Sequence, residues 1–452
     1  MDNSSKKIPK IAHRGRFWGN VKWQLISVVS QTLLSAILLA ITARQLGAVE
    51  YGVMSIVLGY VAVVNLLLEP RIQDVAGKEF SNLNQYDGLS VQQKQEIIDL
   101  FIVEGICKFL PCVSLILLAP ILVKIGNLSS DSSLLIIVAA TGAFLTKLGS
   151  GLSVGLLRVI GRLDLHTYCA VGDLFIRLLF TVALIKFSML SVLAYLVVFS
   201  FTGILSNAIL LMFVARQFEG IGASMKVWKP SEAIQRIQKK RNLIIVNIGL
   251  SASDLMNKDL DVTLMSPLIS SEQIGNYKMA KNIAMLTLRA IDPFYSAMLP
   301  EISRLVAMRN FPGVRLLILK SSIGLLILSL FASFASYALI VLYGDVIIGT
   351  GFSTAHKLLP CMLIGVTVGS SFIWAHPLVV ALNRADISLK GSLFGSIVGL
   401  ATFFNLTTSY GALGSSIAWS LTMVSTFVFT ALASYFLLRE RERQISINYN
   451  KE

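Results

Sequence analysis

Long stretches without a charged residue limit this chain to a membrane environment. They include Trp23 to Ala43, Phe187 to Ala215, Ser321 to Gly344 and Gly391 to Leu438. A helix crosses the hydrocarbon core of a bilayer with about 20 apolar residues, because its backbone groups bond within the helix. Only 14% of the residues are charged, whereas soluble proteins carry roughly 25%. The sequence therefore predicts an integral membrane protein that crosses the bilayer many times.

Twelve segments have the length and apolar character of a spanning helix. The last uncharged stretch is long enough for two of them. The first 20 residues are polar and basic, and the segment after them is long enough to span, so we expect an anchor and no cleaved signal peptide. The twelve segments lie near residues 22–42, 51–69, 101–123, 132–157, 170–187, 190–214, 242–269, 277–302, 315–342, 358–382, 389–406 and 412–438.

The Lys and Arg residues fall mainly in alternate connecting segments. If the N-terminus is cytoplasmic, the cytoplasmic side carries most of them, and the opposite side keeps only Arg44, Lys124, Lys186, Lys278 and Lys357. Cytoplasmic loops of membrane proteins carry such an excess. The pattern predicts twelve spans with both termini in the cytoplasm. It also explains much of the net charge of +14 without a nucleic-acid partner.

The chain also contains an internal duplication. Residues 46–52 resemble residues 269–275, and residues 160–165 resemble residues 382–387. Because the offset is close to half the chain, two six-helix halves of the same orientation are predicted, and transporters of this kind bind substrate between their halves. The expected parts are a cytoplasmic segment 1–21, a bundle 22–214, a basic linker 215–241, a bundle 242–438 and a cytoplasmic tail 439–452.

Ionisable residues inside the spans are the candidates for function, because each costs about 2.5–3.5 kcal/mol at a helix centre. Three acids are followed four residues later by a base, which places both on one helix face: Glu104 and Lys108, Asp173 and Arg177, Asp254 and Lys258. These pairs either neutralise each other and hold helices together, or line a polar cavity.

The segment 242–269 is too polar for a helix that faces lipid. It carries Asp254, Lys258, Asp259 and Asp261 within eight residues, so we expect it to line a water-filled cavity. Lys147 has no acid within four positions of its own helix. Its ammonium either attracts an anion such as phosphate or reaches the lipid headgroups.

No feature of the sequence predicts an enzyme, a metal site or a cofactor. The 4 Cys and 4 His residues are scattered and form no ligand cluster. No phosphate-binding loop of an ATP-driven pump is present. The longest outer connection, roughly 343–357, is too short for the catalytic loop of a membrane polymerase.

Several motifs resemble those of Wzx-type polysaccharide flippases, a branch of the superfamily that also holds the MATE exporters. Residues 43–52, ARQLGAVEYG, resemble the family signature "AR-x-LG-x-x-x-YG". Residues 271–280 and 410–418 resemble its "s-x-x-x-G-x-Y-x-x-A" and "yGaiGaaiA" segments. The resemblance covers essentially the whole chain and implies an all-α, MATE-like membrane fold of two six-helix bundles.

The resemblance also implies a function. Such proteins flip a polyprenyl-pyrophosphate-linked oligosaccharide repeat unit across the bacterial cytoplasmic (inner) membrane by alternating access, for O-antigen, capsule or exopolysaccharide synthesis. The expected partners are this lipid-linked oligosaccharide, membrane lipids, H⁺ or Na⁺ as a coupling ion, a polysaccharide polymerase and a chain-length regulator.

Basic residues in the spans are the expected ligands of the pyrophosphate, since Lys and Arg bind phosphate oxygens with charge-assisted hydrogen bonds. The candidates are Lys147, Arg177, Lys258 and Arg289. Candidates for sugar binding or ion coupling are Asp173, Asp254 and Asp261. The alternative function is a MATE-like, cation-coupled multidrug exporter, which would favour an acidic and aromatic lumen. A lipid II flippase is a further relative, although such proteins usually carry extra helices.

Overall fold

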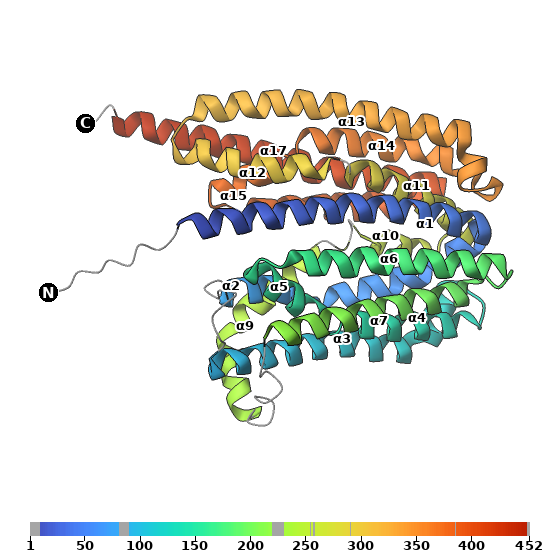
Figure 1. The fold of residues 1–452 in the computed structure, drawn as a ribbon. Coiled ribbons are helices and arrows are strands. Elements are labelled where there is room, and N and C mark those ends of the chain that lie inside the picture. The colour runs from blue at the N-terminus through green and yellow to red at the C-terminus, as the bar shows by residue number, and fades with distance from the viewer. Residues whose placement is uncertain are drawn as a thin grey trace.

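The computed structural model describes residues 10–80, 90–218, 230–253, 255, 258–289, 291–384 and 386–449. Within these ranges the chain is helical almost throughout and contains no strand (Figure 1). Nine helical stretches of the described chain are long and apolar enough to cross a membrane. The first of the nine includes two of the predicted spans, 22–42 and 51–69. The protein is therefore an all-α, multi-pass membrane protein.

Helix α1 (Lys10–Leu67) is two helical arms joined at Gly47. Gly47 has φ 71°, a conformation that glycine adopts without strain, and the chain reverses there (Figure 1). The turn lies at the end of the molecule opposite the chain termini, as the topology predicts. The helices that follow in this half are α2 (Ile72–Glu79), α3 (Val91–Ile125), α4 (Ser132–Lys147), α5 (Ser150–Ile160), α6 (Leu163–Lys186) and α7 (Val192–Gln217).

The second half begins with α9, a polar helix that packs against α3 and α1. After it come short and long helices that pack mainly on one another, with α17 against both α16 and α14. Their bounds are α9 (Pro230–Ser253), α10 (Leu260–Met265), α11 (Ser271–Arg289), α12 (Asp292–Ala307), α13 (Phe311–Ile347), the 3₁₀ turn η2 (Thr350–Phe352), α14 (Ala355–Ser371), α15 (Ala375–Ala381), α16 (Asp386–Tyr410) and α17 (Ala412–Tyr449).

Four predicted spans are not single helices. Those predicted as 132–157 and 358–382 are each interrupted by a short turn, at 148–149 and at 372–374, between two apolar helices. The segment predicted as 242–269 is split, because α9 ends at Ser253 and α10 begins only at Leu260. The segment predicted as 277–302 is split into α11 and α12, with Pro293 in the first turn of α12. Proline cannot continue a preceding helix, since it lacks the backbone N–H. The expectation of continuous helices was wrong for all four segments. In 242–269 and 277–302 the breaks fall where charged residues and proline interrupt the apolar pattern.

The duplication has a structural counterpart. Gly161 and Asn383 are equivalent in the repeat, and both have positive φ, 78° and 58°. The Arg and Asp that follow each of them form the same local ion pair, at 3.1 Å for Arg162–Asp164 and 2.9 Å for Arg384–Asp386. Equivalent sequence therefore produces equivalent turns in the two halves.

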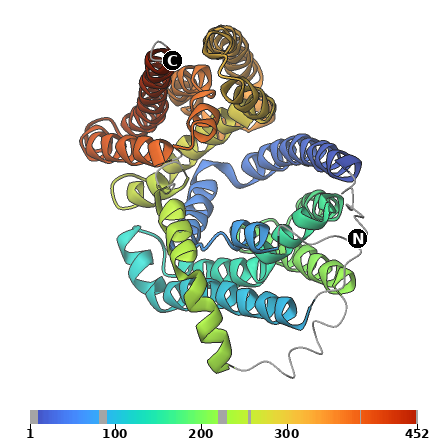
Figure 2. The same ribbon diagram turned by 90° about the vertical axis from the view of Figure 1, so that its left-hand side faces the viewer.

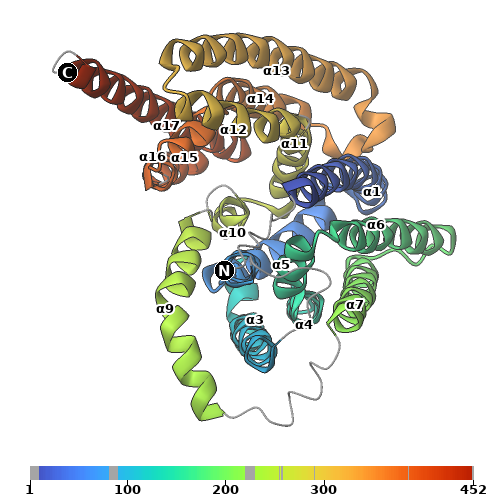
Figure 3. The ribbon, with the colours of Figure 1, turned by 60° about the vertical axis from the view of Figure 1, so that its left-hand side comes forward.

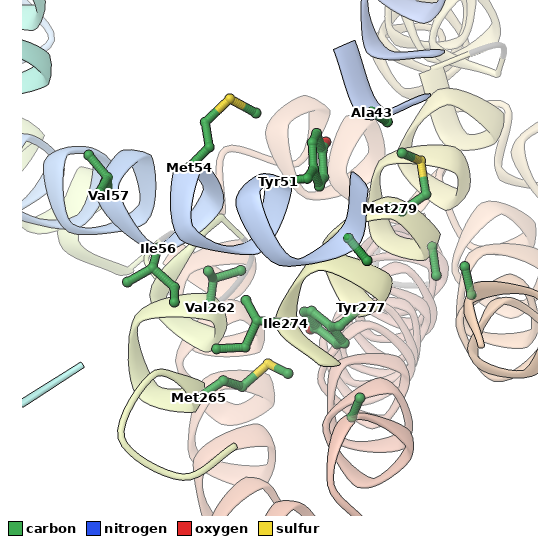
Figure 4. Close-up of a cluster of buried hydrophobic side chains, with 14 of the residues drawn as sticks. Ala43, Tyr51, Met54, Ile56, Val57, Val262, Met265, Ile274, Tyr277 and Met279 are labelled. Carbon is green, nitrogen blue, oxygen red and sulfur yellow. The ribbon is translucent and has the colours of Figure 1, made fainter. Parts of the chain in front are cut away.

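The helices α3 to α7 gather in one group and α12 to α17 in another (Figures 2 and 3). Helices α1 and α11 pack against each other between the groups. The main apolar core joins residues of α1, α10 and α11, among them Ile56, Val262, Ile274 and Tyr277 (Figure 4). Large apolar side chains remain exposed on the outer helices, as lipid-facing residues do.

Candidate functional site

Two cavities that contain charged side chains lie among the helices. The first, here named the α5 cavity, has a volume of about 300 Å³ and is more polar than apolar. It is formed by the end of α1, by α2, by the middle of α3, and by the junction of α4 and α5. The residues around it are Leu66, Glu69, Arg71, Ile72, Gln73, Glu104, Lys108, Lys147, Ser150, Gly151, Ser251 and Lys258.

The acids of the α5 cavity are occupied by partners. Glu69 forms an ion pair with the buried Lys108. Glu104 accepts hydrogen bonds from the backbone N–H groups of Gly151 at 2.8 Å and Leu152 at 3.0 Å. The first N–H groups of a helix have no partner within it, so Glu104 satisfies the start of α5. Neither carboxylate is left to attract a free cation.

Two cations of the same cavity are open to a ligand. The Lys147 and Lys258 side chains are exposed, and neither forms an ion pair within the described chain. Lys147 is the last residue of α4, and Gly149, in the left-handed conformation at φ 71°, separates α4 from α5. This break places Lys147 beside the start of α5, where an anion would meet positive charge and the helix dipole.

The second cavity, named the α11 cavity, has a volume of about 320 Å³. It lies between both arms of α1, the helices α6 and α7, and α11, and it is nearer to the Gly47 turn. Its residues are Ser35, Leu38, Leu39, Thr42, Tyr51, Met54, Ser55, Leu58, Leu174, Arg177, Tyr195, Asp259, Lys278, Asn282, Met285, Leu286 and Arg289.

Arg177 is fixed in the α11 cavity by three contacts. Its guanidinium binds Asp173 at 2.6 Å and Thr202 at 3.2 Å, and it lies 4.1 Å from the centre of the Phe199 ring. The contact with the ring is a cation–π interaction. Two of these partners come from α7, so Arg177 has one well-defined orientation.

The remaining charges of the α11 cavity come from the other half of the chain. Lys278 forms an ion pair with Asp259. Arg289 is exposed and has no ion-pair partner within the described residues. The amide of Asn282 donates a hydrogen bond to the Tyr51 hydroxyl at 2.8 Å. The cavity thus combines cations with neutral hydrogen-bonding groups.

An apolar groove adjoins the α11 cavity. This α13 groove has a volume of about 390 Å³ and lies between the first arm of α1, α11 and α13. Leu39 and Leu286 line both the groove and the α11 cavity. Apart from Thr287 and Ser336, every residue around the groove is apolar. A polar and an apolar site are therefore continuous.

The structure divides the predicted pyrophosphate ligands between the two cavities. Lys147 and Lys258 line the α5 cavity, while Arg177 and Arg289 line the α11 cavity. Asp173 contacts Arg177 from the same helix. Asp254 lies outside the described residues.

Asp261 does not line either cavity. Its side chain is 2% exposed and is bound by Lys281 at 2.7 Å and by the Tyr277 hydroxyl. A sugar cannot reach Asp261 in this conformation.

The predicted ion pairs fare differently. Asp173 and Arg177 are paired as their spacing predicts. Glu104 and Lys108 are not paired with each other, because each finds a closer partner on another element. Helical spacing specifies which residues share a face, and it says nothing about what that face meets.

Six charged residues of the cavities were not among the predicted ligands: Glu69, Arg71, Glu104, Lys108, Asp259 and Lys278. Glu69 and Arg71 flank Pro70 at the end of an apolar run, a signal that marks a break in the helix. Arg71 donates a hydrogen bond to Ser251 of α9 at 3.0 Å. Lys278 follows the segment 242–269 closely, and the distribution of basic residues predicts that it lies on the outer side of the membrane.

Comparison with known proteins gives the family and the fold. Residues 17–306 match the family described as "Polysaccharide biosynthesis protein". No curated protein matches the sequence significantly. The lipid II flippase MurJ in an inward closed conformation matches with a TM-score of 0.68 and 10% identity, over 92% of this chain and 87% of MurJ.

Two MATE multidrug resistance transporters of the MOP superfamily have the same fold. The inward-facing structure matches with a TM-score of 0.66 and 14% identity, over 92% of this chain and 95% of the transporter. The outward-facing structure has a TM-score of 0.51 and 15% identity, over 95% of this chain and 96% of that one. The chain thus has the fold of MATE transporters and MurJ, and it belongs to the polysaccharide biosynthesis protein family.

Proposed function

We propose that this protein is a Wzx-type flippase, which moves a polyprenyl-pyrophosphate-linked oligosaccharide repeat unit across the bacterial cytoplasmic membrane by alternating access. The observation that supports this most strongly is the charge of the two cavities. In each of them the cations outnumber the acids by two.

The α5 cavity suits a diphosphate. Arg71, Lys108, Lys147 and Lys258 face two acids there, both of which already have partners. A diphosphate placed between Lys147 and Lys258 would meet two ammonium groups that need no acid to be displaced. Charge-assisted hydrogen bonds of this kind are roughly twice as strong as neutral ones.

The α11 cavity and the α13 groove together suit an amphiphile. The cavity offers Arg177, Lys278 and Arg289 to an anionic headgroup, and Tyr51, Tyr195 and Asn282 to sugar hydroxyls. The groove offers an apolar surface that continues from it at Leu39 and Leu286. A lipid-linked sugar has a polar headgroup joined to an apolar tail. The α11 cavity can therefore bind the headgroup while the α13 groove binds the tail.

The exporter of cationic drugs fits these cavities less well. A cation in the α5 cavity would meet Lys147 and Lys258, neither of which forms an ion pair with another described residue. In the α11 cavity it would have to take Asp259 from Lys278. Coulomb energy opposes the binding of a cation in both cavities, and this effect is strong where water is scarce.

The proposed cycle begins on the cytoplasmic side, where both termini would lie. The two six-helix halves, 22–214 and 242–438, would rock about the α1–α11 contact. H⁺ or Na⁺ would couple the movement to an ion gradient. A polymerase and a chain-length regulator would then use the repeat unit for O-antigen, capsule or exopolysaccharide.

Genetic complementation tests the proposal. The gene is deleted in its host, and the strain receives wild type, Lys147→Met, Lys258→Met or Arg289→Met, with membrane levels measured for each. Loss of surface polysaccharide is expected in the deletion and in the three variants, with the lipid-linked precursor accumulating. Lys390→Met is the control, because Lys390 is 63% exposed, pairs with Asp386 and lines no cavity described here.

A different outcome would decide for the exporter. If the deletion strain keeps its surface polysaccharide and becomes sensitive to cationic drugs, the flippase proposal fails. Wild-type polysaccharide in all three well-expressed variants would exclude the two cavities as the binding site.

A further inference from the structure

Lys281 is a buried cation that lines none of the three cavities. Its side chain is 3% exposed and lies on α11. Its ammonium donates to both carboxylate oxygens of Asp261, at 2.8 and 2.7 Å. It also donates to the backbone carbonyl of Lys258. An ammonium has three donors, and all three are used.

Asp261 is equally saturated. It accepts hydrogen bonds from the Tyr277 hydroxyl and from the backbone N–H of Val262, the latter at 2.8 Å. Tyr277 is fully buried and belongs to the apolar core between α1 and α11 (Figure 4). The chain of contacts therefore connects that core to Lys281, and Lys281 to the backbone at Lys258.

The backbone held in this way separates the α5 cavity from the α11 cavity. Lys258 lines the α5 cavity, and the next residue, Asp259, lines the α11 cavity. Lys258 lies in a turn before α10. Its carbonyl is held by a side chain of α11, and no backbone N–H of a described residue donates a hydrogen bond to it. Asp259 is held by Lys278, one helical turn before Lys281.

We infer that Lys281 is a positioning residue for headgroup binding: by holding the Lys258 carbonyl, it presents the Lys258 ammonium to the α5 cavity. This inference rests on the proposed function, in which Lys258 binds the diphosphate. Asp261 and Tyr277 orient Lys281 in turn. The three residues act through Lys258 and do not touch the ligand.

A double-mutant cycle with farnesyl diphosphate as the probe tests this. Its affinity is measured by calorimetry on the full-length protein in detergent. Lys281→Met alone leaves Asp261 as a buried, unpaired charge, so Asp261→Asn/Lys281→Met is the variant used. It removes both charges and keeps the Tyr277 contact. We expect it to weaken binding about tenfold, as Lys258→Met does, since one charge-assisted hydrogen bond is lost in each.

Non-additivity separates positioning from general damage. Adding Lys258→Met to Asp261→Asn/Lys281→Met should cause no further loss of affinity, because the Lys258 ammonium is already misplaced in Asp261→Asn/Lys281→Met. Adding Lys147→Met should multiply the loss, because Lys147 belongs to a different helix. Unchanged affinity in Asp261→Asn/Lys281→Met, or additive losses with Lys258→Met, would overturn the inference.

The same experiment distinguishes the two proposals. If wild type binds farnesyl diphosphate and Lys147→Met weakens it, the headgroup site stands, and the cycle decides the role of Lys281 alone. If wild type does not bind the probe, the headgroup site and the positioning role both fail.

Discussion

Replacing Gly52 by alanine should open the contact between α1 and α11. A Cβ added at Gly52 would lie 1.8 Å from the carbonyl oxygen of Ser271, and one added at Gly275 would lie 2.0 Å from the carbonyl oxygen of Ala48. Both obstacles are backbone atoms, which cannot rotate away. The contact lies near the Gly47 turn, at the end of the molecule opposite the chain termini, which the positive-inside pattern predicts to be the outer side.

The size of the effect follows from these distances. Real Cβ contacts essentially never fall below 3.0 Å, so the two segments must separate by at least about 1.2 Å. Tyr51 and Ile274, which are 3% and 0% exposed beside the contact, would lose packing. Overfilling a well-packed site costs about 1–3 kcal/mol. This corresponds to roughly a 5- to 150-fold change, toward the open state, in the equilibrium constant between the closed and open contact.

Thiol labelling from outside intact cells measures this shift. The four cysteines are first replaced, and Ser35→Cys provides a thiol in the α11 cavity. We expect a membrane-impermeant maleimide to label it several-fold faster in Gly52→Ala, while transport falls. Gly324→Ala is the control, because a Cβ there meets nothing within 4 Å. Equal labelling and transport in Gly52→Ala and wild type would refute the argument that this contact closes the outer side.

Three further changes have defined outcomes. Arg177→Met should lower stability by about 1–3 kcal/mol, because it leaves the part-buried Asp173 without its 2.6 Å partner, and Arg177→Met/Asp173→Asn should regain most of the melting temperature in detergent. Arg236→Met should act similarly at the contact between α9 and α3, where Asp99 binds at 2.6 Å and its hydrogen bond raises the pKa of Arg236 above the ordinary value; there Arg236→Met/Asp99→Leu should restore the melting temperature. Ala335→Phe should fill the α13 groove, which adjoins the α11 cavity, and lower surface polysaccharide at least threefold in the complemented strain at equal membrane levels, while farnesyl diphosphate affinity in the α5 cavity stays unchanged. Wild-type polysaccharide in this variant would show that the groove does not bind the tail.

The fold was predictable because the membrane allows few alternatives. Apolar runs of spanning length must be helices in lipid, and eight of the twelve predicted spans are single apolar helices or helical arms of the described chain. Two more, 132–157 and 358–382, are apolar stretches of spanning length that a short turn divides into two helices. The two exceptions are segments 242–269 and 277–302, which carry more charged residues than any other predicted span. Their breaks depend on which neighbours stabilise those charges, and hydropathy carries no such information.

The charge balance of the cavities was not predictable for a related reason. The spans contain equal numbers of candidate acids and bases, and only the fold decides which of them face a cavity. Glu104 turns toward the start of α5, and Asp261 turns toward Lys281. Both acids thus have partners inside the protein, while Lys147 and Arg289 remain open to a ligand.

The duplication explains why glycine occurs on both sides of the α1–α11 contact. The offset that relates the two halves carries Ala48 onto Ser271 and Gly52 onto Gly275. Gly52 meets the carbonyl of Ser271, and Gly275 meets the carbonyl of Ala48. Because Ala48 and Ser271 are themselves equivalent, the contact is reciprocal, as in an interface with two-fold symmetry. A side chain on either glycine would separate the same two segments. One movement of the halves can therefore open both contacts together, and Gly275→Ala should reproduce the effect of Gly52→Ala, with the two changes combined costing less than their sum.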